Sequence, residues 1–422
     1  MAEQIKAVRG VKDILPDEIG VWRAVEQVAF SVLEGFGFEE IRVPIIEELG
    51  LFERSVGTFT DIVQKEMYVF KDKKGRTLAL RPEATASVVR AFLEHQLYLK
   101  KRITRLYYSG AMFRYDRPQK GRYRQFHQIG AEIFGGAGGN YDGELIVAIV
   151  RILERMKISG FTVELNSVGC PECKAKYGAE LKKFFSERSQ KFCHDCRTRA
   201  QHNILRVLDC KVESCKSVLA HAPIMSEILC AECLGHMNEV IAYLASIGVS
   251  VRTNPHLVRG LDYYTKTVFE VKVENDENAV AGGGRYDNLV QQLGGPSTPA
   301  AGFAIGMERI CAVVAVQEMK KPAISAVFLG EKALRDGTPL INALRSRGIK
   351  IAADYDDRPL KSQLKTADKE GTRYVLILGE NELERREFLF KDMKSGSQQF
   401  VSFDSIEQFL KGLIDAADAH MR

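Results

Sequence analysis

The stretch MFRYDRPQKGRYRQFHQIGAEIFG, residues 112–135, carries the clearest fold signal in this chain. Its second half alternates, so that Gln128 and Glu132 lie on one face of an extended strand and the odd-numbered apolar residues lie on the other. The preceding segment TRLYYSGAMFR (104–114) also has strand character, and the polar, basic residues 115–123 join the two. The pattern predicts a long β-hairpin with cations at its turn and a carboxylate on one face.

The side chains of this hairpin leave two interpretations open. A carboxylate such as Glu132 on a half-buried face needs a partner, which is a ligand ammonium, an imidazole N–H or a structural arginine of the protein. The planar guanidinium group of arginine donates paired hydrogen bonds that suit phosphate oxygens, and an aromatic side chain such as Phe126 stacks well on a base. The hairpin therefore belongs either to a site for a triphosphate nucleotide beside a cationic small molecule, or to a structural ion pair.

Length and composition narrow the class of protein. The chain has 422 residues, which is enough for two or three domains. Hydrophobic residues make up 45% and charged residues 27%, as in soluble globular proteins, and a net charge of +5 does not by itself indicate a nucleic-acid partner. The N-terminus lacks the apolar core of a signal peptide and no stretch is long enough to span a membrane, so we expect a cytoplasmic protein without membrane attachment.

Upstream of the hairpin, two segments have clear patterns. Residues 17–37 carry apolar residues at helical spacing and end at Gly-Phe-Gly, which predicts a helix. The segment FEEIRVPIIEE (38–48) has the composition of a strand, but Pro44 interrupts it, which is typical of a sheet edge or of contact with another chain. Residues 76–95 predict a strand, a turn at Arg-Pro-Glu and a helix.

Downstream of the hairpin, the character of the chain changes twice. Residues 141–157 predict an amphipathic helix and residues 161–167 a strand. Strand patterns and a glycine turn return after a helical, cysteine-rich stretch. From AVFLG (326–330) onward, three short apolar strands alternate with helices near 336–347 and 359–370, which predicts a separate α/β unit with a mostly parallel sheet.

The cysteine-rich stretch contains four cysteine pairs. The pairs are Cys170 and Cys173, Cys193 and Cys196, Cys210 and Cys215, and Cys230 and Cys233. In a reducing compartment, such spacings are typical of tetrahedral structural zinc sites. The alternative is that these thiols are simply buried in a core, and the spacing does not say which pairs belong together. Cys311 lies apart, in an apolar segment, and is expected to be a core residue.

Taken in order, these motifs resemble a known family. The segments LRPEATA, RPQKGRYRQFHQIGAEIFG, LVRGLDYYTKTVFE, AGGGRYDNLV and GFAIGMER are similar to the motifs of class II aminoacyl-tRNA synthetases and, within that class, of the histidyl-tRNA synthetase family. The resemblance covers nearly the whole chain. It implies an α+β fold with an antiparallel-sheet catalytic core at 1–167 and 249–322, a Cys-rich helical insertion at 168–248, and an α/β anticodon-binding domain at 323–422.

The resemblance also implies roles for individual residues. The residues expected around the substrate histidine are Glu83, Thr85, Arg114, Gln128, Glu132, Arg259, Tyr263 and Tyr264. Those expected to bind ATP are Arg114, Arg122, Phe126 and Arg309, with Phe126 against adenine and Arg122 and Arg309 on the outer phosphates. Arg259 and Arg114 are the expected catalytic residues, facing each other across the α-phosphate, where other class II enzymes use a metal.

The implied activity is ligation of L-histidine to tRNA(His) with ATP and Mg²⁺, by a homodimer with Pro44 near its interface. A second hypothesis is a catalytically silent, histidine-binding regulator of histidine biosynthesis. Such relatives lack the C-terminal domain and the ATP-binding arginines, whereas residues 325–422, Arg114, Arg259 and Arg309 are all present here. A general RNA-binding protein, the third hypothesis, leaves Glu83 and Glu132 without a role.

Overall fold

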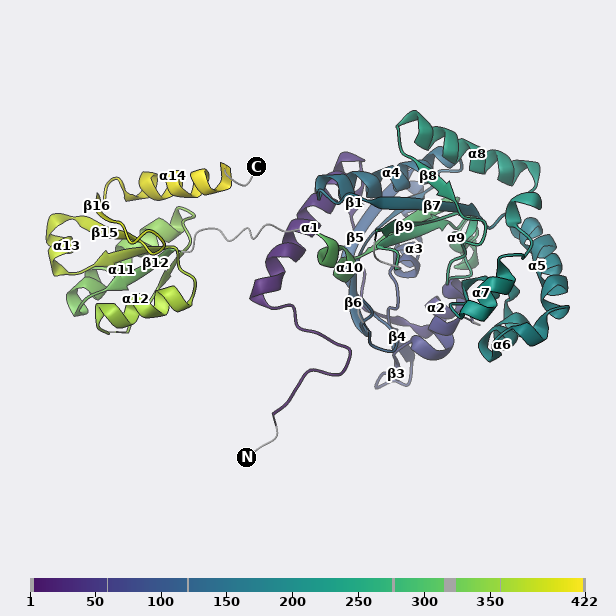
Figure 1. The fold of residues 1–422 in the computed structure, drawn as a ribbon, viewed down its shortest axis with the longest axis horizontal. Helices are drawn as coiled ribbons and strands as arrows, with labels where there is room; N and C mark the ends of the chain where they lie inside the picture. Colours follow the sequence, from purple (N-terminus) through teal and green to yellow (C-terminus); the bar gives the residue numbers. More distant parts are fainter. Residues whose placement is uncertain are drawn as a thin grey trace. The chain divides into compact units, whose positions relative to one another are not determined.

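The computed structural model describes residues 4–58, 60–119, 121–274, 278–314, 324–356 and 358–419. Lys120 of the hairpin turn and the expected domain junction at 322/323 lie outside these residues. The chain divides into two compact units, Met1–Ala315 and Val316–Arg422 (Figure 1). Within the described residues, no helix has the length and apolar character needed to cross a bilayer.

The larger unit is built on an eight-stranded sheet with the order β1-β5-β6-β11-β10-β9-β7-β8. Its strands are β1 (Glu39–Glu40), β5 (Thr104–Phe113), β6 (Gln125–Phe134), β7 (Phe161–Ser167), β8 (Val251–Thr253), β9 (Thr265–Val273), β10 (Ala281–Arg285) and β11 (Ala300–Gly306). Adjacent strands are antiparallel except for β1–β5 and β7–β8, the pairs at the two edges. The predicted antiparallel core is confirmed.

The opening stretch forms the predicted hairpin. Strands β5 and β6 pair from Phe113 and Gln125 at the turn to Thr104 and Phe134 at the far end. The alternation works as predicted, because the odd-numbered apolar residues of β6 are buried in the core on one side of the sheet. Glu132 and the other even-numbered residues therefore point to the opposite side.

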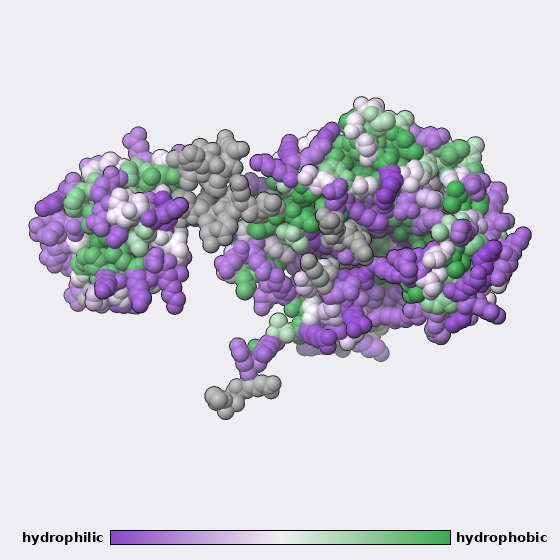
Figure 2. All heavy atoms as spheres, viewed as in Figure 1, coloured by the Kyte–Doolittle hydropathy of each residue, from purple (hydrophilic) through white to green (hydrophobic). Residues whose placement is uncertain are grey.

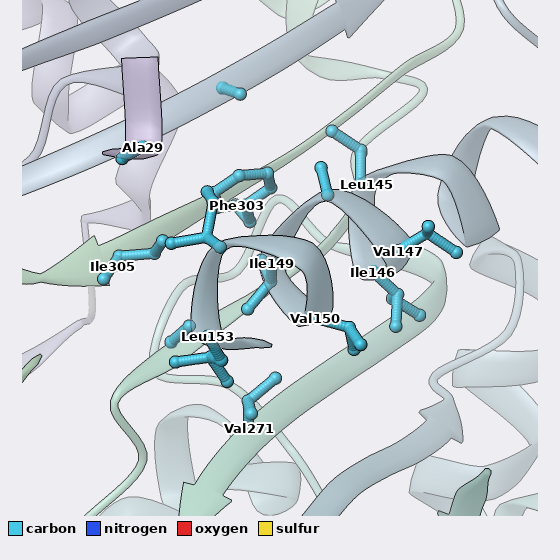
Figure 3. Packing of buried hydrophobic residues seen from close by; sticks show 14 of the residues in the cluster. Ala29, Leu145, Ile146, Val147, Ile149, Val150, Leu153, Val271, Phe303 and Ile305 are labelled. Atoms are coloured by element: carbon cyan, nitrogen blue, oxygen red, sulfur yellow. The ribbon is translucent and has the colours of Figure 1, made fainter. Parts of the chain in front are cut away.

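Helices cover the first side of the sheet. They are α1 (Pro16–Gly35), α4 (Gly139–Arg155), α8 (Ala231–Ser246) and α10 (Met307–Val313). Helix α4 is apolar over most of its circumference, since it packs between the sheet and other helices. Figure 3 shows its side chains among Val271 of β9 and Phe303 and Ile305 of β11. Burial of this side leaves the other side of the sheet for ligands.

The segment around Pro44 differs from the predicted interrupted strand. Strand β1 ends before it and pairs with β5, while β2 (Ile46–Glu48) joins a second sheet with the order β2-β4-β3. The other strands of that sheet are β3 (Val69–Lys71) and β4 (Thr77–Leu80), next to α2 (Leu49–Phe52) and α3 (Thr85–Glu94). The bend is held by Arg81, whose Nη1 donates to the carbonyl of Val43 at 2.8 Å. Proline has no N–H for a ladder, so it marks the change of sheet.

The insertion is helical and has a core of its own (Figure 1, teal). Its helices are α5 (Pro171–Ser186), α6 (His194–His202), α7 (Glu213–Leu219) and the start of α8, and α9 (Leu289–Gln292) lies after it in the chain. The core of the insertion combines aromatic residues such as Tyr177 and Phe184 with all eight paired cysteines. The visible surface of the protein is predominantly hydrophilic, with hydrophobic side chains in smaller groups (Figure 2).

The smaller unit contains a five-stranded sheet with the order β13-β12-β14-β15-β16. Its elements are β12 (Ile324–Phe328), α11 (Glu331–Ser346), β13 (Ile351–Ala353), α12 (Leu360–Lys369), β14 (Tyr374–Leu378), α13 (Glu380–Arg385), β15 (Glu387–Asp392), β16 (Gln398–Ser402) and α14 (Ile406–Ala419). The three predicted parallel strands are present. The sheet is mixed, however, because β15 and β16 add antiparallel pairs that the sequence pattern did not predict.

Candidate active site

A hollow on the open side of the sheet holds the candidate site. One row of the sheet reads Gly130, Ala304, Gly282 and Glu270 across strands β6, β11, β10 and β9. Small residues in three of these four positions leave room above the sheet, and a cavity of about 740 Å³ opens there. The predicted site residues on its walls are Arg114, Arg122, Phe126, Gln128, Arg259 and Arg309. The fold therefore brings together six residues that span 196 positions of sequence, from 114 to 309.

Arg114 stands where β5 ends. Its Nε donates to the carbonyl oxygen of Pro82 at 2.8 Å, and its guanidinium lies 5.2 Å from the centre of the Phe126 ring. Burial lowers the pKa of Arg114, Glu66 and Glu83 act against this shift, and the positive charge of Arg259 adds to it. The two arginines therefore experience each other's charge inside one cavity, an arrangement that an anion between them would relieve.

Arg259 lies in the loop between β8 and β9, directly over Gly282. A Cβ atom at position 282 would stand 2.6 Å from Nη1 of Arg259, so only glycine leaves room for this side chain. Arg259 forms an ion pair with Glu270, and burial opposes its charge while Tyr264 and Glu270 raise its pKa. Its Nε is buried and has no hydrogen-bond partner in the described part of the chain. One donor of this arginine therefore remains available to a ligand.

Glu132 is fully buried beneath the cavity and is held by three hydroxyl groups. Thr85 Oγ1 donates to it at 2.8 Å, Tyr108 Oη at 3.4 Å, and Tyr286 Oη also donates. Burial raises the pKa of Glu132 to about 8. No protein cation contacts this carboxylate among the residues that the structure describes, so the structural arginine considered from the sequence is absent. The hydroxyl groups already hydrogen-bond this carboxyl group, and a ligand ammonium or imidazole N–H stays open as a further partner.

A glycine of β11 lies directly opposite this carboxylate. Gly302 pairs with Glu132 across β11 and β6, and a Cβ at position 302 would stand 1.6 Å from the Glu132 carboxylate. The missing side chain therefore makes room for Glu132 itself. Gly306, the second glycine of this segment, borders the cavity, where a Cβ would meet only Arg309 at ordinary contact distance.

The remaining predicted residues are buried next to the cavity and do not form its walls. Glu83 accepts the backbone N–H groups of Thr85 at 2.7 Å and Ala86 at 2.9 Å, and so caps the start of α3. Burial raises the pKa of Glu83. The rings of Tyr263 and Tyr264 pack in a tilted arrangement, with centres 4.7 Å apart and an interplanar angle of 51°. Together these residues fix the surroundings of Glu132 in a rigid, largely apolar setting.

Gln128 lies next to these buried residues, and its side chain lines the cavity. Its Oε1 is buried and finds no hydrogen-bond partner among the described residues. An unpaired buried acceptor costs free energy unless a ligand or water donates to it. Gln128 therefore marks a place where a ligand donor fits.

Two further arginines stand at the outer wall. Arg122 contacts Asp116 at 3.2 Å within the hairpin turn. Arg309, in the first turns of α10, donates to the carbonyl oxygens of Ala279 at 2.6 Å and Gly121 at 3.3 Å. Both lie on the wall of the same cavity, as predicted for cations that meet the outer phosphates.

Several residues of the site were missed by sequence reasoning. Glu270, Gly282 and Tyr286 hold Arg259 and Glu132 in place, and Arg199 and Arg206 of the insertion line the cavity. Their sequence signals are weak, because an alternating strand position or a glycine run does not reveal what lies across the sheet. Residues 199 and 206 belong to the cysteine-rich insertion, and the sequence pattern does not show where this insertion lies against the core.

An antiparallel sheet that carries the Arg-containing hairpin and the terminal GFAIGMER segment on one cavity, with the Arg-Pro-Glu turn held next to it by Arg114, defines a class II aminoacyl-tRNA synthetase. Residues 10–310 match the family model described as histidyl-tRNA synthetase, and residues 311–413 match the anticodon binding domain. The chain belongs to the histidyl-tRNA synthetase family and is an aminoacyl-tRNA ligase.

Similar proteins cover almost the whole chain. The histidine–tRNA ligase of Thermodesulfovibrio yellowstonii is 45% identical over 97% of this chain and 98% of that protein. The histidine–tRNA ligase of Aquifex aeolicus is 45% identical over 95% of this chain and all of that protein. Among solved structures, apo histidyl-tRNA synthetase of S. aureus matches with a TM-score of 0.80 and 33% identity, over 97% of this chain and 100% of that one.

Proposed function

We propose that this enzyme activates L-histidine with ATP to histidyl-adenylate and pyrophosphate and then transfers histidine to the 3′ end of tRNA(His). The observation that carries the proposal is the cavity itself. Arg114 and Arg259, which are far apart in sequence, line it together beside a buried carboxylate that has no cationic partner in the described residues. Paired guanidinium groups suit phosphate, and the carboxylate suits a ligand ammonium.

In the proposed first step, a carboxylate oxygen of histidine attacks the α-phosphorus of ATP. The new P–O bond forms as the bond to the bridging oxygen breaks, and pyrophosphate leaves with the Mg²⁺ that accompanies the nucleotide. Arg114 and Arg259 hold the α-phosphate from the walls of the cavity and stabilise the charge that develops there. Arg122 and Arg309 meet the outer phosphates, and Phe126 lies against adenine.

Selection of histidine is assigned to the layer around Glu132. The carboxylate of Glu132 accepts a ligand N–H, and Gln128 Oε1, which has no hydrogen-bond partner in the described part of the chain, accepts a second. Glu83 acts mainly by holding Thr85, whose hydroxyl in turn orients Glu132. Tyr263 and Tyr264 supply the apolar wall for the imidazole ring and polar tips for its nitrogen atoms.

In the second step, the terminal ribose hydroxyl of tRNA attacks the activated carbonyl, and AMP leaves. This step needs no side-chain nucleophile. The C-terminal unit is proposed to bind the anticodon of tRNA(His), and the exposed lysines Lys361, Lys365 and Lys369 follow one side of α12, with Arg373 just after it. Cations so placed are suited to the phosphates of the anticodon arm. The proposed location is the cytoplasm.

The silent regulator remains the second hypothesis and is not favoured. A regulator without chemistry has no need of the arginines at 114, 259 and 309 around one cavity, nor of the anticodon-binding unit that follows them. Relatives that share nearly the full length of this chain carry the name histidine–tRNA ligase.

A homodimer is proposed from the second sheet. Ile46 of β2 and Phe70 of β3 are 48% and 40% exposed, and the sheet register places them on the same face as the half-buried Leu78 and Leu80. The opposite face of that sheet packs inward through Ala79. An exposed apolar face beside Pro44 fits a copy of the same chain related by a two-fold axis.

A structural metal is a separate part of the proposal. The catalytic site requires only ATP with Mg²⁺. Zinc is proposed for the eight paired cysteines of the insertion, where it would stabilise the fold and take no part in the chemistry.

Pyrophosphate exchange into ATP tests the proposed function. The purified enzyme is incubated with ATP, Mg²⁺ and labelled pyrophosphate, together with each amino acid in turn. Exchange that depends on histidine alone supports the proposal, and histidine then joins tRNA(His) in a charging assay. Exchange with a different amino acid overturns the assigned substrate, and histidine binding without any exchange favours the silent regulator.

A further inference from the structure

The eight paired cysteines gather into two groups that the sequence spacing does not reveal. The outer group contains Cys170, Cys173, Cys230 and Cys233, and the inner group contains Cys193, Cys196, Cys210 and Cys215. The inner group therefore lies wholly within the chain segment that the outer group closes. In each group, the four sulfur atoms lie within 4.8 Å of one another.

The sulfur separations fit one metal ion in each group. Sγ of Cys170 and Cys173 are 3.6 Å apart, and Sγ of Cys193 and Cys210 are 3.9 Å apart. Four sulfurs at about 2.3 Å from a tetrahedral zinc ion are separated by about 3.8 Å. All eight cysteines are free thiols. An iron–sulfur cluster attaches its cysteines to different iron atoms and spreads them farther apart, so these compact groups suit a single ion.

Backbone N–H groups are already directed at the sulfurs. The amide of Cys193 donates to Cys215 Sγ at 3.2 Å, and the amide of Cys230 donates to Cys173 Sγ at 3.2 Å. Such hydrogen bonds favour the thiolate form that a metal requires, and they orient the ligands. Cys196 and Cys215 are fully buried, so an unligated set of thiolates there would have no solvent to stabilise it.

We propose that the insertion binds two structural zinc ions, one at the outer and one at the inner group, each through four thiolates. The outer ion ties the start of α5 to the start of α8, the two points where the insertion leaves and rejoins the core. It stands next to β9, because the Val168 amide donates to the Lys266 carbonyl at 2.7 Å and the Lys266 amide donates to Gly169 at 2.9 Å.

The inner ion has a second consequence, which rests on the proposed function. The segment between Cys196 and Cys210 reaches the catalytic core: Arg199 contacts Asp61 at 3.4 Å, and Asn203 donates to Asp262 at 3.0 Å. Asp262 immediately precedes the tyrosine pair of the histidine pocket. Arg199, Cys193 and Cys210 all border the catalytic cavity, so the inner ion fixes one of its walls.

Metal analysis of the purified full-length enzyme by mass spectrometry tests the two sites. The wild type is expected to contain about two zinc ions per chain. The paired variants Cys173→Ser/Cys233→Ser and Cys196→Ser/Cys215→Ser should each lose one ion and keep the other. The matched control Cys311→Ser, outside both groups, should keep both. Fewer than about half an ion in the wild type overturns the proposal.

The same variants distinguish nested sites from sites made by consecutive pairs. If Cys170 to Cys196 formed one site and Cys210 to Cys233 the other, each double variant would damage both sites and lose both ions. The mixed variant Cys173→Ser/Cys196→Ser should lose both ions under the nested arrangement and only one under the consecutive one. Opposite counts overturn the pairing.

Cobalt substitution in the wild type guards against variants that fail to fold. Two equivalents of Co²⁺ per chain should give intense visible absorption bands with sulfur-to-metal charge transfer, as expected of tetrahedral thiolate sites. Weak octahedral bands would overturn the assigned ligands. Metal content is read without any activity assay, so failure of the zinc proposal and failure of the proposed ligase function are distinguishable.

Discussion

At the scale of single residues, Arg259 has a buried Nε without a hydrogen-bond partner among the described residues, and we propose that its guanidinium contacts the α-phosphate. Replacement by histidine would shorten the side chain and remove that guanidinium. We expect Arg259→His to lower the rate of adenylate formation by about 10²-fold or more, as for loss of a group that stabilises a transition state. Histidine binding should weaken but stay measurable. Single-turnover adenylate formation and equilibrium dialysis with histidine measure the two effects.

The matched control for this change is Arg151→His on α4, where the arginine side chain is 39% exposed and forms an ion pair with Glu154. Arg151→His should change the rate of adenylate formation by no more than about two-fold, because a substitution on the surface away from the cavity has little effect. An Arg259→His enzyme as fast as the control would show that Arg259 does not act on the phosphate.

Glu132 carries a prediction about pH. Its folded-state pKa is about 8, above the ordinary value of 4.5, because burial disfavours its charged form. In the ligand-free enzyme, its contribution to stability is therefore fully present below pH 4.5 and is lost as the pH rises to about 8. Relative to Glu132→Gln, the wild type should lose up to about 1.4 kcal/mol per pH unit within that window and nothing further above it.

Chemical denaturation of the two proteins between pH 5 and pH 9 measures this difference. Histidine should reverse the trend, because a bound cation favours the carboxylate, and the variant should need much more histidine for the same protection. A stability difference that does not change with pH would mean that Glu132 is ionised in the free enzyme, held by a group outside those described.

Local sequence pattern placed some site residues in their elements, while their roles around a ligand were implied by the resemblance to the family and stay predictions. Glu132 alternates within its own strand, and Glu83 precedes a helix by two residues. The residues that it missed act across the sheet or between elements. Tyr286 reaches Glu132 from the residue just after β10, and Gly282 leaves the room that Arg259 needs to pass over it. Strand register determines such contacts, and no short pattern reports it.

At the scale of elements, the predictions that rest on a local sequence pattern were correct, and contacts between distant segments were missed. The hairpin β5–β6 and helix α4 follow from hydrophobic periodicity, which is a local property. Strands β15 and β16 escaped prediction because their alternation is partial, with β16 mostly exposed. The cysteine spacings indicated tetrahedral sites but not their pairing, since Cys170 reaches Cys233 only after α5 and α8 have folded beside each other.

At the scale of the whole molecule, the chain forms two compact units whose sheets are covered in different ways. The catalytic unit builds one side of its sheet into a helix-packed core and leaves the other side open to ligands. The smaller unit has separate cores of its own on the two sides of a mixed sheet. Each unit therefore has the buried core that a domain needs.

The exposed apolar face of the second sheet supports a prediction about assembly. Phe70→Glu places a charge on that face, which is favourable in water and unfavourable inside an apolar interface. We expect the wild type to have twice the mass of one chain in size-exclusion chromatography with light scattering, and the variant to shift toward the mass of one chain at micromolar concentration. The control is Phe400→Glu, which changes a phenylalanine that is 50% exposed in the C-terminal unit and should leave the mass unchanged. A wild type with the mass of a single chain would contradict the dimer, and a dimer that tolerates Phe70→Glu would place its interface on another surface.

If the dimer forms as proposed, Arg81 also gains a role, because its hydrogen bonds to Val43 and Ala111 hold the bend at Pro44 that directs β2 toward the partner.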